Sequence, residues 1–290
     1  MEIQPGLPVV DQPLNPLSPM RPLIAGNWKM NGLAAQLDVI ERICASVAAA
    51  PPCADVLICP PATLIGRATQ AAAGCIAIGG QDCASEIAGA FTGDTSAEML
   101  RDAGASAVIV GHSERRRQHG ETDAVVAAKV RAARRAGLMP IVCIGETLAQ
   151  RQDGNALSVC GEQLLGSIPE DALTAAALAI AYEPLWAIGS GHTPAPEQIE
   201  EMHGHIRAVL TTRFGALASN VRILYGGSVN PSNASAILAM FNVGGALVGG
   251  ASLRADAFEA ILACAQAGQR GLAAGAASLK SRSPKPASPA

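Results

Sequence analysis

The sequence predicts a single parallel (β/α)8 barrel. Eight short apolar runs recur along the chain, and each is followed by a polar or glycine-rich turn and then by a longer segment with helical periodicity. The runs are apolar without strict alternation, which is typical of parallel strands that are buried on both faces. Strands that alternate with helices pair in parallel through right-handed crossovers, and a chain of 290 residues suits one such barrel.

The apolar runs and the turns that end them place the strands. We expect strands at Leu23–Asn27, Asp55–Cys59, Ile76–Gln81, Ala107–Gly111, Met139–Ile144, Ala177–Glu183, Arg222–Tyr225 and Ala246–Val248. The helical segments between them include Leu33–Ala49, Thr122–Ala136, Pro196–Phe214 and Pro231–Met240. Eight strands, each followed by helical sequence, fit a closed barrel better than an open sheet.

The two ends of the chain lack this pattern. Residues 1–20 are rich in proline, and the last twenty residues are mostly Ala, Ser, Pro and Lys without an apolar face. We therefore expect flexible tails at 1–20 and 267–290 around one barrel domain at 21–266. Met20 stands directly before the first strand, and we expect it to be the natural start. The first residues resemble neither a signal peptide nor a membrane anchor.

The composition excludes a disordered chain, because 49% of the residues are apolar and only 16% are charged. A net charge of -3 gives no reason to expect nucleic acid or a membrane surface as a partner. The eight cysteines form no Cys-x-x-Cys pair, and most of them lie within apolar runs. We expect reduced, buried thiols and no metal site.

In a barrel of this type, functional residues lie at the carboxyl ends of the strands. There the first strand carries Lys29, the fourth His112 and the sixth Glu183, and the turns after the last three strands are rich in glycine. Backbone N–H groups exposed by glycine turns form a phosphate site in many barrels. Together with a lysine, these turns predict an anionic, phosphorylated small molecule as the ligand.

Five segments at these strand ends resemble the triosephosphate isomerase family. They are Gly-Asn-Trp-Lys-Met-Asn, Val-Gly-His-Ser-Glu-Arg-Arg, Ala-Tyr-Glu-Pro-Leu-Trp-Ala-Ile-Gly-Ser-Gly, Tyr-Gly-Gly-Ser-Val and Leu-Val-Gly-Gly-Ala-Ser-Leu, in family order and at family spacing. The resemblance implies a TIM barrel that interconverts dihydroxyacetone phosphate and D-glyceraldehyde 3-phosphate through an enediolate. It also implies a cytoplasmic enzyme of glycolysis and gluconeogenesis, linked to the pentose phosphate pathway, that needs no cofactor and no metal.

The resemblance also implies a role for each site residue. Glu183 is the base that moves the proton between carbons, His112 polarises the carbonyl, and Lys29 and Asn27 stabilise the enediolate charge. The phosphate is bound by Asn27, Lys29 and the backbone N–H groups of Gly189, Ser228, Gly249 and Gly250. Glu114 orients Lys29 or its neighbours, and residues 184–194 form a lid that brings Ile188 and Leu247 beside the base.

A glycine-rich segment at Gly89–Asp94 resembles the family's dimer loop. The resemblance implies a homodimer in which Thr92 lies at the loop tip, close to the site of the second subunit. It further implies that Asp94 pairs with an arginine across the interface, for which Arg115 is the candidate. The run Arg115–Arg117 is better explained by this interface or by a solvated helix start than by nucleic acid.

Three other functions are compatible with parts of this pattern. A sister aldose–ketose isomerase acting on a four-carbon sugar phosphate would keep all five segments. A non-catalytic phosphosugar-binding protein has no need of the base Glu183. An aldolase on the same scaffold requires a Schiff-base lysine at a central strand end, and none of the last five strands ends in one.

The sequence departs from the family at Pro194, where alanine is common. In relatives the backbone N–H at this position donates to the tyrosine of the Tyr-Gly-Gly-Ser segment when the lid closes, and proline has no N–H. We hypothesise that Tyr225 cannot latch the lid directly and that Ser228, bonding near Gly191, does so instead.

Two single variants test this hypothesis about the latch. Tyr225→Phe should change kcat/KM little, whereas Ser228→Ala should lower it much more, because only the serine hydroxyl has a backbone donor to engage. Steady-state kinetics of both variants provide the measurement. The reverse order of losses would refute the hypothesis.

Overall fold

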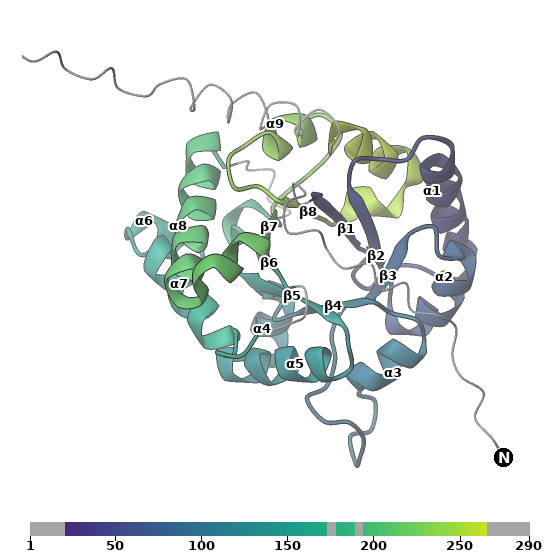
Figure 1. Cartoon of the computed structure of the whole chain (residues 1–290), viewed down its shortest axis with the longest axis horizontal. Helices are drawn as coiled ribbons and strands as arrows, with labels where there is room; N and C mark the ends of the chain where they lie inside the picture. Colours follow the sequence, from purple (N-terminus) through teal and green to yellow (C-terminus); the bar gives the residue numbers. More distant parts are fainter. Residues whose placement is uncertain (1–20, 173–177, 189–193, 266–290) are drawn as a thin grey trace, which may run out of the picture.

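The computed structural model describes residues 21–172, 178–188 and 194–265. The expected tails at 1–20 and 267–290 lie outside these ranges, and so does Gly189 with the rest of the lid to residue 193. Within the described part, eight parallel strands close into a barrel in sequence order, with helices around the outside (Figure 1). The predicted (β/α)8 fold is therefore confirmed.

The strands match the predicted ones closely. They are β1 (Leu23–Asn27), β2 (Asp55–Cys59), β3 (Ala77–Gly80), β4 (Ala107–Val110), β5 (Met139–Ile144), β6 (Ala179–Tyr182), β7 (Arg222–Tyr225) and β8 (Gly245–Val248). Gln81, Gly111 and Glu183 were expected as the last residues of strands but lie beyond them. These three residues therefore belong to the rim of the barrel rather than to its sheet.

The helices lie outside the sheet. They are α1 (Leu37–Ala49), α2 (Ile65–Ala72), α3 (Ala97–Asp102), α4 (Ser113–His119), α5 (Asp123–Arg135), α6 (Leu148–Gln152), α7 (Ala156–Ser167), α8 (Pro196–Phe214) and α9 (Ala234–Leu238), and residues 255–265 are also helical. The helix expected at Pro231–Met240 is shorter because Asn230 accepts the backbone N–H of Ser232 and makes a turn before it. No helix in the described ranges is both long and apolar enough to cross a bilayer.

The sheet is buried on both faces, as the uniformly apolar strands predict. Inward-pointing side chains form the centre of the barrel and are mostly small or branched: Ala25, Leu57, Ala107, Ile109, Ile141, Ala179, Ala181, Leu224 and Leu247. The alternate positions, among them Ile24, Ile58 and Ile180, point outward and belong to a second cluster that also contains helix residues such as Ile40 of α1 and Met202 of α8. This packed interior leaves the loops at the strand ends as the place for a site.

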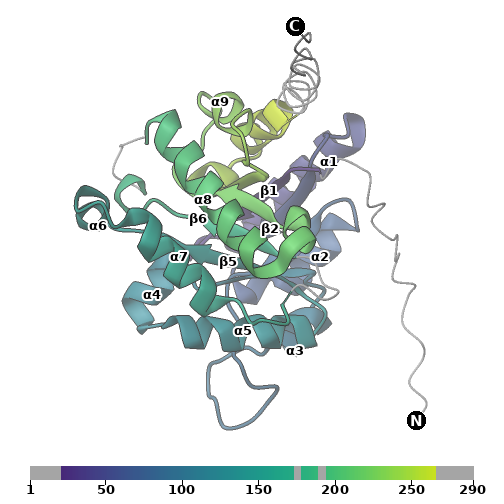
Figure 2. The same cartoon turned by 60° about the vertical axis from the view of Figure 1, so that its left-hand side comes forward.

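A loop between β3 and α3 projects away from the barrel (Figure 2). Its two sides meet where the backbone N–H of Ala84 donates to Thr95 at 2.8 Å. Residues 86–94 beyond this bridge are exposed, and they include Thr92 and Asp94. The loop is thus fixed at its root and open to solvent at its tip.

Four charged side chains attach the root of this loop to α4 and α5. Lys129 Nζ lies 2.7 Å from Asp82 and 2.6 Å from Glu121, and Arg115 contacts the same two carboxylates at 2.8 and 2.6 Å. Burial raises the pKa of Asp82, an effect that Lys129 and Arg115 only partly offset. At Glu121 the hydrogen bonds and charges of the same two cations outweigh burial and lower the pKa. Each cation is therefore needed to compensate a largely buried negative charge.

Removing the lysine of this cluster should destabilise the fold. Lys129→Met leaves two carboxylates with one cation, and breaking a buried pair typically costs about 3–5 kcal/mol. The free energy of unfolding in urea is the measurement. Arg254→Met is the control, because the Arg254–Asp256 pair is exposed and such pairs contribute about 0–1 kcal/mol. Equal losses in the two variants would contradict the buried role of Lys129.

Candidate active site

The predicted site residues gather around one cavity of about 410 Å³ at the carboxyl ends of the strands. Asn27 is the last residue of β1 and Lys29 follows it, His112 follows β4, and Glu183 follows β6. The cavity is lined by Asn27, Lys29, His112, Glu183, Ile188, Ser228, Leu247, Gly249 and Gly250. Strand ends separated by more than two hundred residues in the sequence therefore form a single pocket.

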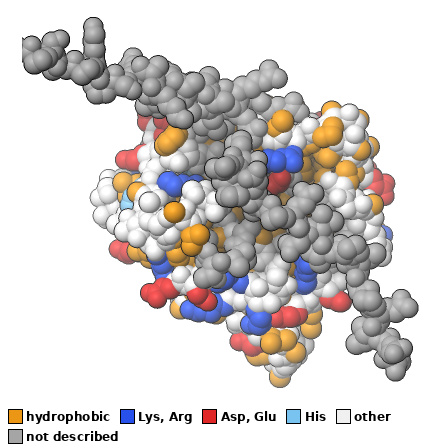
Figure 3. Space-filling view, in the orientation of Figure 1, with side chains coloured by type: hydrophobic (Ala, Val, Ile, Leu, Met, Phe, Trp, Pro, Cys, Tyr) orange, Lys and Arg blue, Asp and Glu red, His pale blue; other side chains and the backbone are white. Residues whose placement is uncertain are grey.

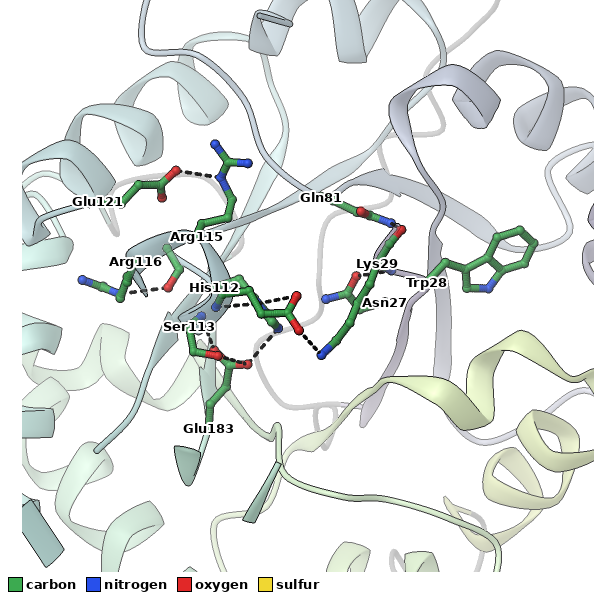
Figure 4. A network of polar contacts seen from close by, with 12 residues as sticks. Asn27, Trp28, Lys29, Gln81, His112, Ser113, Arg115, Arg116, Glu121 and Glu183 are labelled. Atoms are coloured by element: carbon green, nitrogen blue, oxygen red, sulfur yellow. Dashed lines mark hydrogen bonds and ion pairs between the residues drawn. The ribbon is translucent and has the colours of Figure 1, made fainter. Parts of the chain in front are cut away.

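Glu183 is the most deeply buried acid of the cavity, with 2% of its surface exposed. Its Oε2 accepts the backbone N–H of Ser113 at 2.9 Å, and its Oε1 lies 3.3 Å from the Ser113 hydroxyl. The same Oε1 is 2.9 Å from His112 Nε2 (Figure 4). In this structure the carboxylate is thus turned toward the first residues of α4.

The backbone directly after β5 passes very close to the backbone of Glu183, which follows the neighbouring strand β6. A Cβ at Gly145, directly after β5, would lie 1.9 Å from the carbonyl oxygen of Glu183. Only glycine leaves room for the two backbones to approach so closely. The backbone N–H of Glu183 donates to the carbonyl of Ile144 at 2.8 Å, which extends the pairing of β5 and β6 up to Glu183.

His112 caps the amino end of α4. Its Nδ1 accepts the backbone N–H of Glu114 at 3.2 Å. A backbone N–H can only donate, so Nδ1 carries no proton in this arrangement and the ring proton of the neutral imidazole is on Nε2. His112 therefore presents an N–H donor to the cavity.

Lys29 has a left-handed backbone, with φ of 53°, which is uncommon for a residue other than glycine. Two side-chain amides hold this conformation. Asn27 Oδ1 accepts the Lys29 N–H at 3.0 Å, and Gln81 Nε2 donates to the Lys29 carbonyl at 2.9 Å (Figure 4). The conformation turns the lysine side chain toward the cavity, where such strain is typical of functional positions.

The predicted contact between Glu114 and Lys29 is present, with Lys29 Nζ 2.6 Å from Glu114 Oε1. Burial acts to raise the pKa of Glu114, but the hydrogen bond from Lys29 and the nearby positive charge outweigh it and lower the pKa. The carboxylate therefore holds the ammonium group at the edge of the cavity.

Sequence reasoning missed Glu146, which follows β5 and is completely buried. Its Oε1 accepts hydrogen bonds from Arg151 at 2.8 Å, Trp186 at 2.9 Å and Tyr182 at 3.1 Å. Its backbone carbonyl accepts the N–H of Leu185 at 3.1 Å. Glu146 thus ties the residues on both sides of Glu183 to the fifth strand, and its place at a strand end was the signal that could have found it.

The expectation of buried thiols is correct for four cysteines and wrong for others. Cys59, Cys83, Cys143 and Cys160 are buried, whereas Cys53 and Cys75 are exposed. Burial raises the pKa of Cys59 to about 12. Cys143 lies inside the barrel beside Glu183, and its burial, followed by the charge of Glu183, raises its pKa. Its thiol therefore stays protonated beneath the carboxylate.

The other predicted residues take different places. Ser228 follows β7 and is exposed, and Gly249 and Gly250 follow β8, where residues 250–253 form a short 3-10 helix. Tyr225 is buried, and its hydroxyl has no hydrogen-bond partner among the described residues.

Thr92 and Asp94 are on the projecting loop and do not line the cavity. Within the described ranges, no three His, Cys, Asp or Glu side chains are arranged to hold a metal ion.

Comparison with known proteins identifies the family. The family model described as triosephosphate isomerase matches residues 22–265. The triosephosphate isomerase of Xanthobacter flavus is 59% identical over 242 residues, and that of Afipia carboxidovorans is 60% identical over 243 residues; each match covers 83% of this chain and 96% of the relative. A crystal structure of triosephosphate isomerase from Bartonella henselae has a TM-score of 0.77 and 45% identity, and the match covers 84% of this chain and 98% of that chain. With its fold, its cavity and its sequence in agreement, this chain belongs to the triosephosphate isomerase family.

Proposed function

We propose that this protein interconverts dihydroxyacetone phosphate and D-glyceraldehyde 3-phosphate by proton transfer through an enediolate. One observation carries this proposal: Glu183, His112 and Lys29 face one cavity that is also lined by the glycine turns after β7 and β8. The cavity thus combines a carboxylate base, a neutral N–H donor and a cation with a candidate phosphate site. An aldose–ketose isomerisation needs these groups and no redox chemistry.

Glu183 acts as the base in this proposal. It removes a proton from one carbon of the sugar and returns it to the neighbouring carbon. The groups that hold it at present, Ser113 and His112, are exchanged for the substrate when the carboxylate turns into the cavity. That exchange frees the Nε2–H of His112 to donate to the substrate's carbonyl oxygen, where negative charge develops.

Lys29 and Asn27 stabilise the negative charge of the enediolate and its phosphate. Lys29 Nζ is held by Glu114 at 2.6 Å, so the ammonium group is in position before substrate binds and less freedom is lost on binding. The phosphate oxygens bind backbone N–H groups at Ser228, Gly249 and Gly250. Gly189 has the same proposed role and lies outside the described residues.

Ile188 and Leu247 belong to the apolar lining of the cavity. Leu247 is buried at the end of β8, and Ile188 is half-buried after the 3-10 turn Leu185–Ala187. Apolar side chains beside the base exclude water, which protects a reactive intermediate from side reactions. The same residues set the space available to the sugar.

The base assignment predicts a large loss of turnover in Glu183→Asp. The shorter side chain places the carboxylate too far from the substrate carbon, and general-base catalysis typically contributes about 10²–10⁴-fold in rate. Turnover of D-glyceraldehyde 3-phosphate by the purified protein is the measurement. Glu98→Asp is a matched control on α3, where Glu98 pairs with Arg135 away from the cavity.

The same assay separates the alternatives. Faster turnover of four-carbon aldose phosphates would keep the mechanism and change the substrate, and no turnover on either substrate would leave a phosphosugar-binding protein. The relatives named above favour the three-carbon substrate.

The protein also functions as a homodimer in this proposal. Met30 is 96% exposed beside the cavity, and the projecting loop exposes 57% of Ile87 and 45% of Phe91. Hydrophobic side chains are visible at the tip of the loop (Figure 3). Apolar surface of this kind favours a protein interface. Arg115, the candidate partner of Asp94, already contacts Asp82 and Glu121 in its own chain, so Asp94 would join an existing cluster.

A charged side chain introduced into the projecting loop tests whether this loop forms the dimer interface. Phe91→Asp should shift the protein from dimer to monomer, because a carboxylate would have to be buried in the interface. Sedimentation velocity gives the result. Phe241→Asp is the matched control, since Phe241 is 68% exposed on a different loop and its substitution should leave the dimer intact. A stable monomer in the unsubstituted protein would overturn the proposal.

In the cell, the proposed reaction belongs to glycolysis and gluconeogenesis, with triose phosphate as the substrate and the cytoplasm as the compartment. The pentose phosphate pathway shares this triose phosphate.

A further inference from the structure

Two cysteines outside the site lie next to each other in space although 31 positions separate them in the sequence. Cys44 is on the second half of α1, and Cys75 lies in the turn between α2 and β3. Cys75 Sγ donates to the backbone carbonyl of Cys44 at 3.3 Å. Cys44 is half-buried and Cys75 is exposed.

The end of α2 brings the two thiols together. Ala73 and Gly74 both have left-handed backbones, which stop the helix and turn the chain back toward α1. The carbonyl of Ala72 then accepts the Cys75 N–H at 2.8 Å and lies 3.7 Å from Cys44 Sγ. One carbonyl therefore contacts both residues of the pair.

The thiol of Cys75 also affects the pKa of Cys44 electrostatically. Burial, followed by the charge and hydrogen bond of Cys75, raises the pKa of Cys44 to about 11. Cys44 is therefore a poor first nucleophile, and the exposed Cys75 is the more accessible one. The arrangement contains an accessible thiol with a second thiol held behind it.

We propose that Cys44 and Cys75 form an intrachain disulfide when the protein reacts with a small-molecule disulfide oxidant. The Cys75 thiolate attacks one sulfur of the oxidant, whose S–S bond breaks and releases a first thiol. Cys44 then loses its proton and attacks the Cys75 sulfur, which forms the Cys44–Cys75 bond and releases the second thiol. The two protein thiols are oxidised, and the oxidant is reduced to two thiols.

The disulfide would tie α1 to the turn that precedes β3. Cys75 lies just before the amino end of β3, whereas the cavity lies at the carboxyl ends of the strands. The link is therefore remote from Lys29, His112 and Glu183. Its expected effect is on stability, since a cross-link restricts the unfolded chain.

Oxidised glutathione is the probe, with free thiols alkylated before mass spectrometry under non-reducing conditions. We expect a chain lighter by two hydrogen atoms at this pair and a peptide that joins Cys44 to Cys75. The thermal midpoint of the oxidised protein should rise by several degrees and return after treatment with a reducing agent.

Two controls keep the result specific. In Cys44→Ser the glutathione adduct on Cys75 should persist, because no second thiol is present to displace it. Cys53, which is also exposed, should keep its adduct in both proteins. A persistent adduct on Cys75 in the unsubstituted protein, or a link from Cys75 to any cysteine other than Cys44, would overturn the proposal.

Discussion

The closure of the barrel between β1 and β8 is the constraint on which the site depends. The pairing runs from Leu23 opposite Gly245 to Gly26 opposite Val248. Gly245 has φ of 139°, and a Cβ there would lie 2.0 Å from the carbonyl oxygen of Leu23. The last strand can therefore reach the first only through a glycine. Once the barrel is closed, all eight carboxyl ends converge, and Lys29, His112 and Glu183 share one cavity.

The first turn of α4 joins the groups contributed by the other strands. Ser113 and His112 hold the carboxylate of Glu183 from β6, and Glu114 holds the ammonium group of Lys29 from β1. The next two residues attach this turn to the surrounding loops and strands. Arg115 belongs to the charge cluster at the root of the projecting loop, and Arg116 bonds the carbonyls of Gly111 and Cys143. These five consecutive residues therefore connect the turn to Glu183, to Lys29, to the charge cluster and to two backbone carbonyls, so a shift of α4 would move Glu183, His112 and Lys29 together.

Periodicity was sufficient to predict the fold and the strand ends that carry Lys29, His112 and Glu183, whereas the other residues expected in the cavity came from the family resemblance of five segments. Parallel strands bring their carboxyl ends together, so naming the strands also named the residues that meet there. Side-chain contacts between the ends of different strands could not be predicted in this way. Gln81 was expected as the end of a strand, yet its amide holds the backbone of Lys29, and this role depends on the spacing of β1 and β3 rather than on any local pattern. The exposure of Cys75 likewise follows from how α2 ends and not from its apolar neighbours.

Glu146 and Glu183 show how partners decide what a buried carboxylate can do. Both are at strand ends, and both are almost fully buried. Glu146 is bound by Arg151, Tyr182 and Trp186, and the thiol of Cys160 lies 3.6 Å away. Releasing it would leave several buried donors without an acceptor, which is costly, so it is fixed in place. Glu183 is held by Ser113 and His112, and of these two His112 lines the cavity that Glu183 also lines. In the proposed mechanism a ligand oxygen takes over the His112 donor when the carboxylate turns away, so that this one bond is replaced. The two acids are therefore distinguished by their hydrogen-bond partners, although both are almost fully buried.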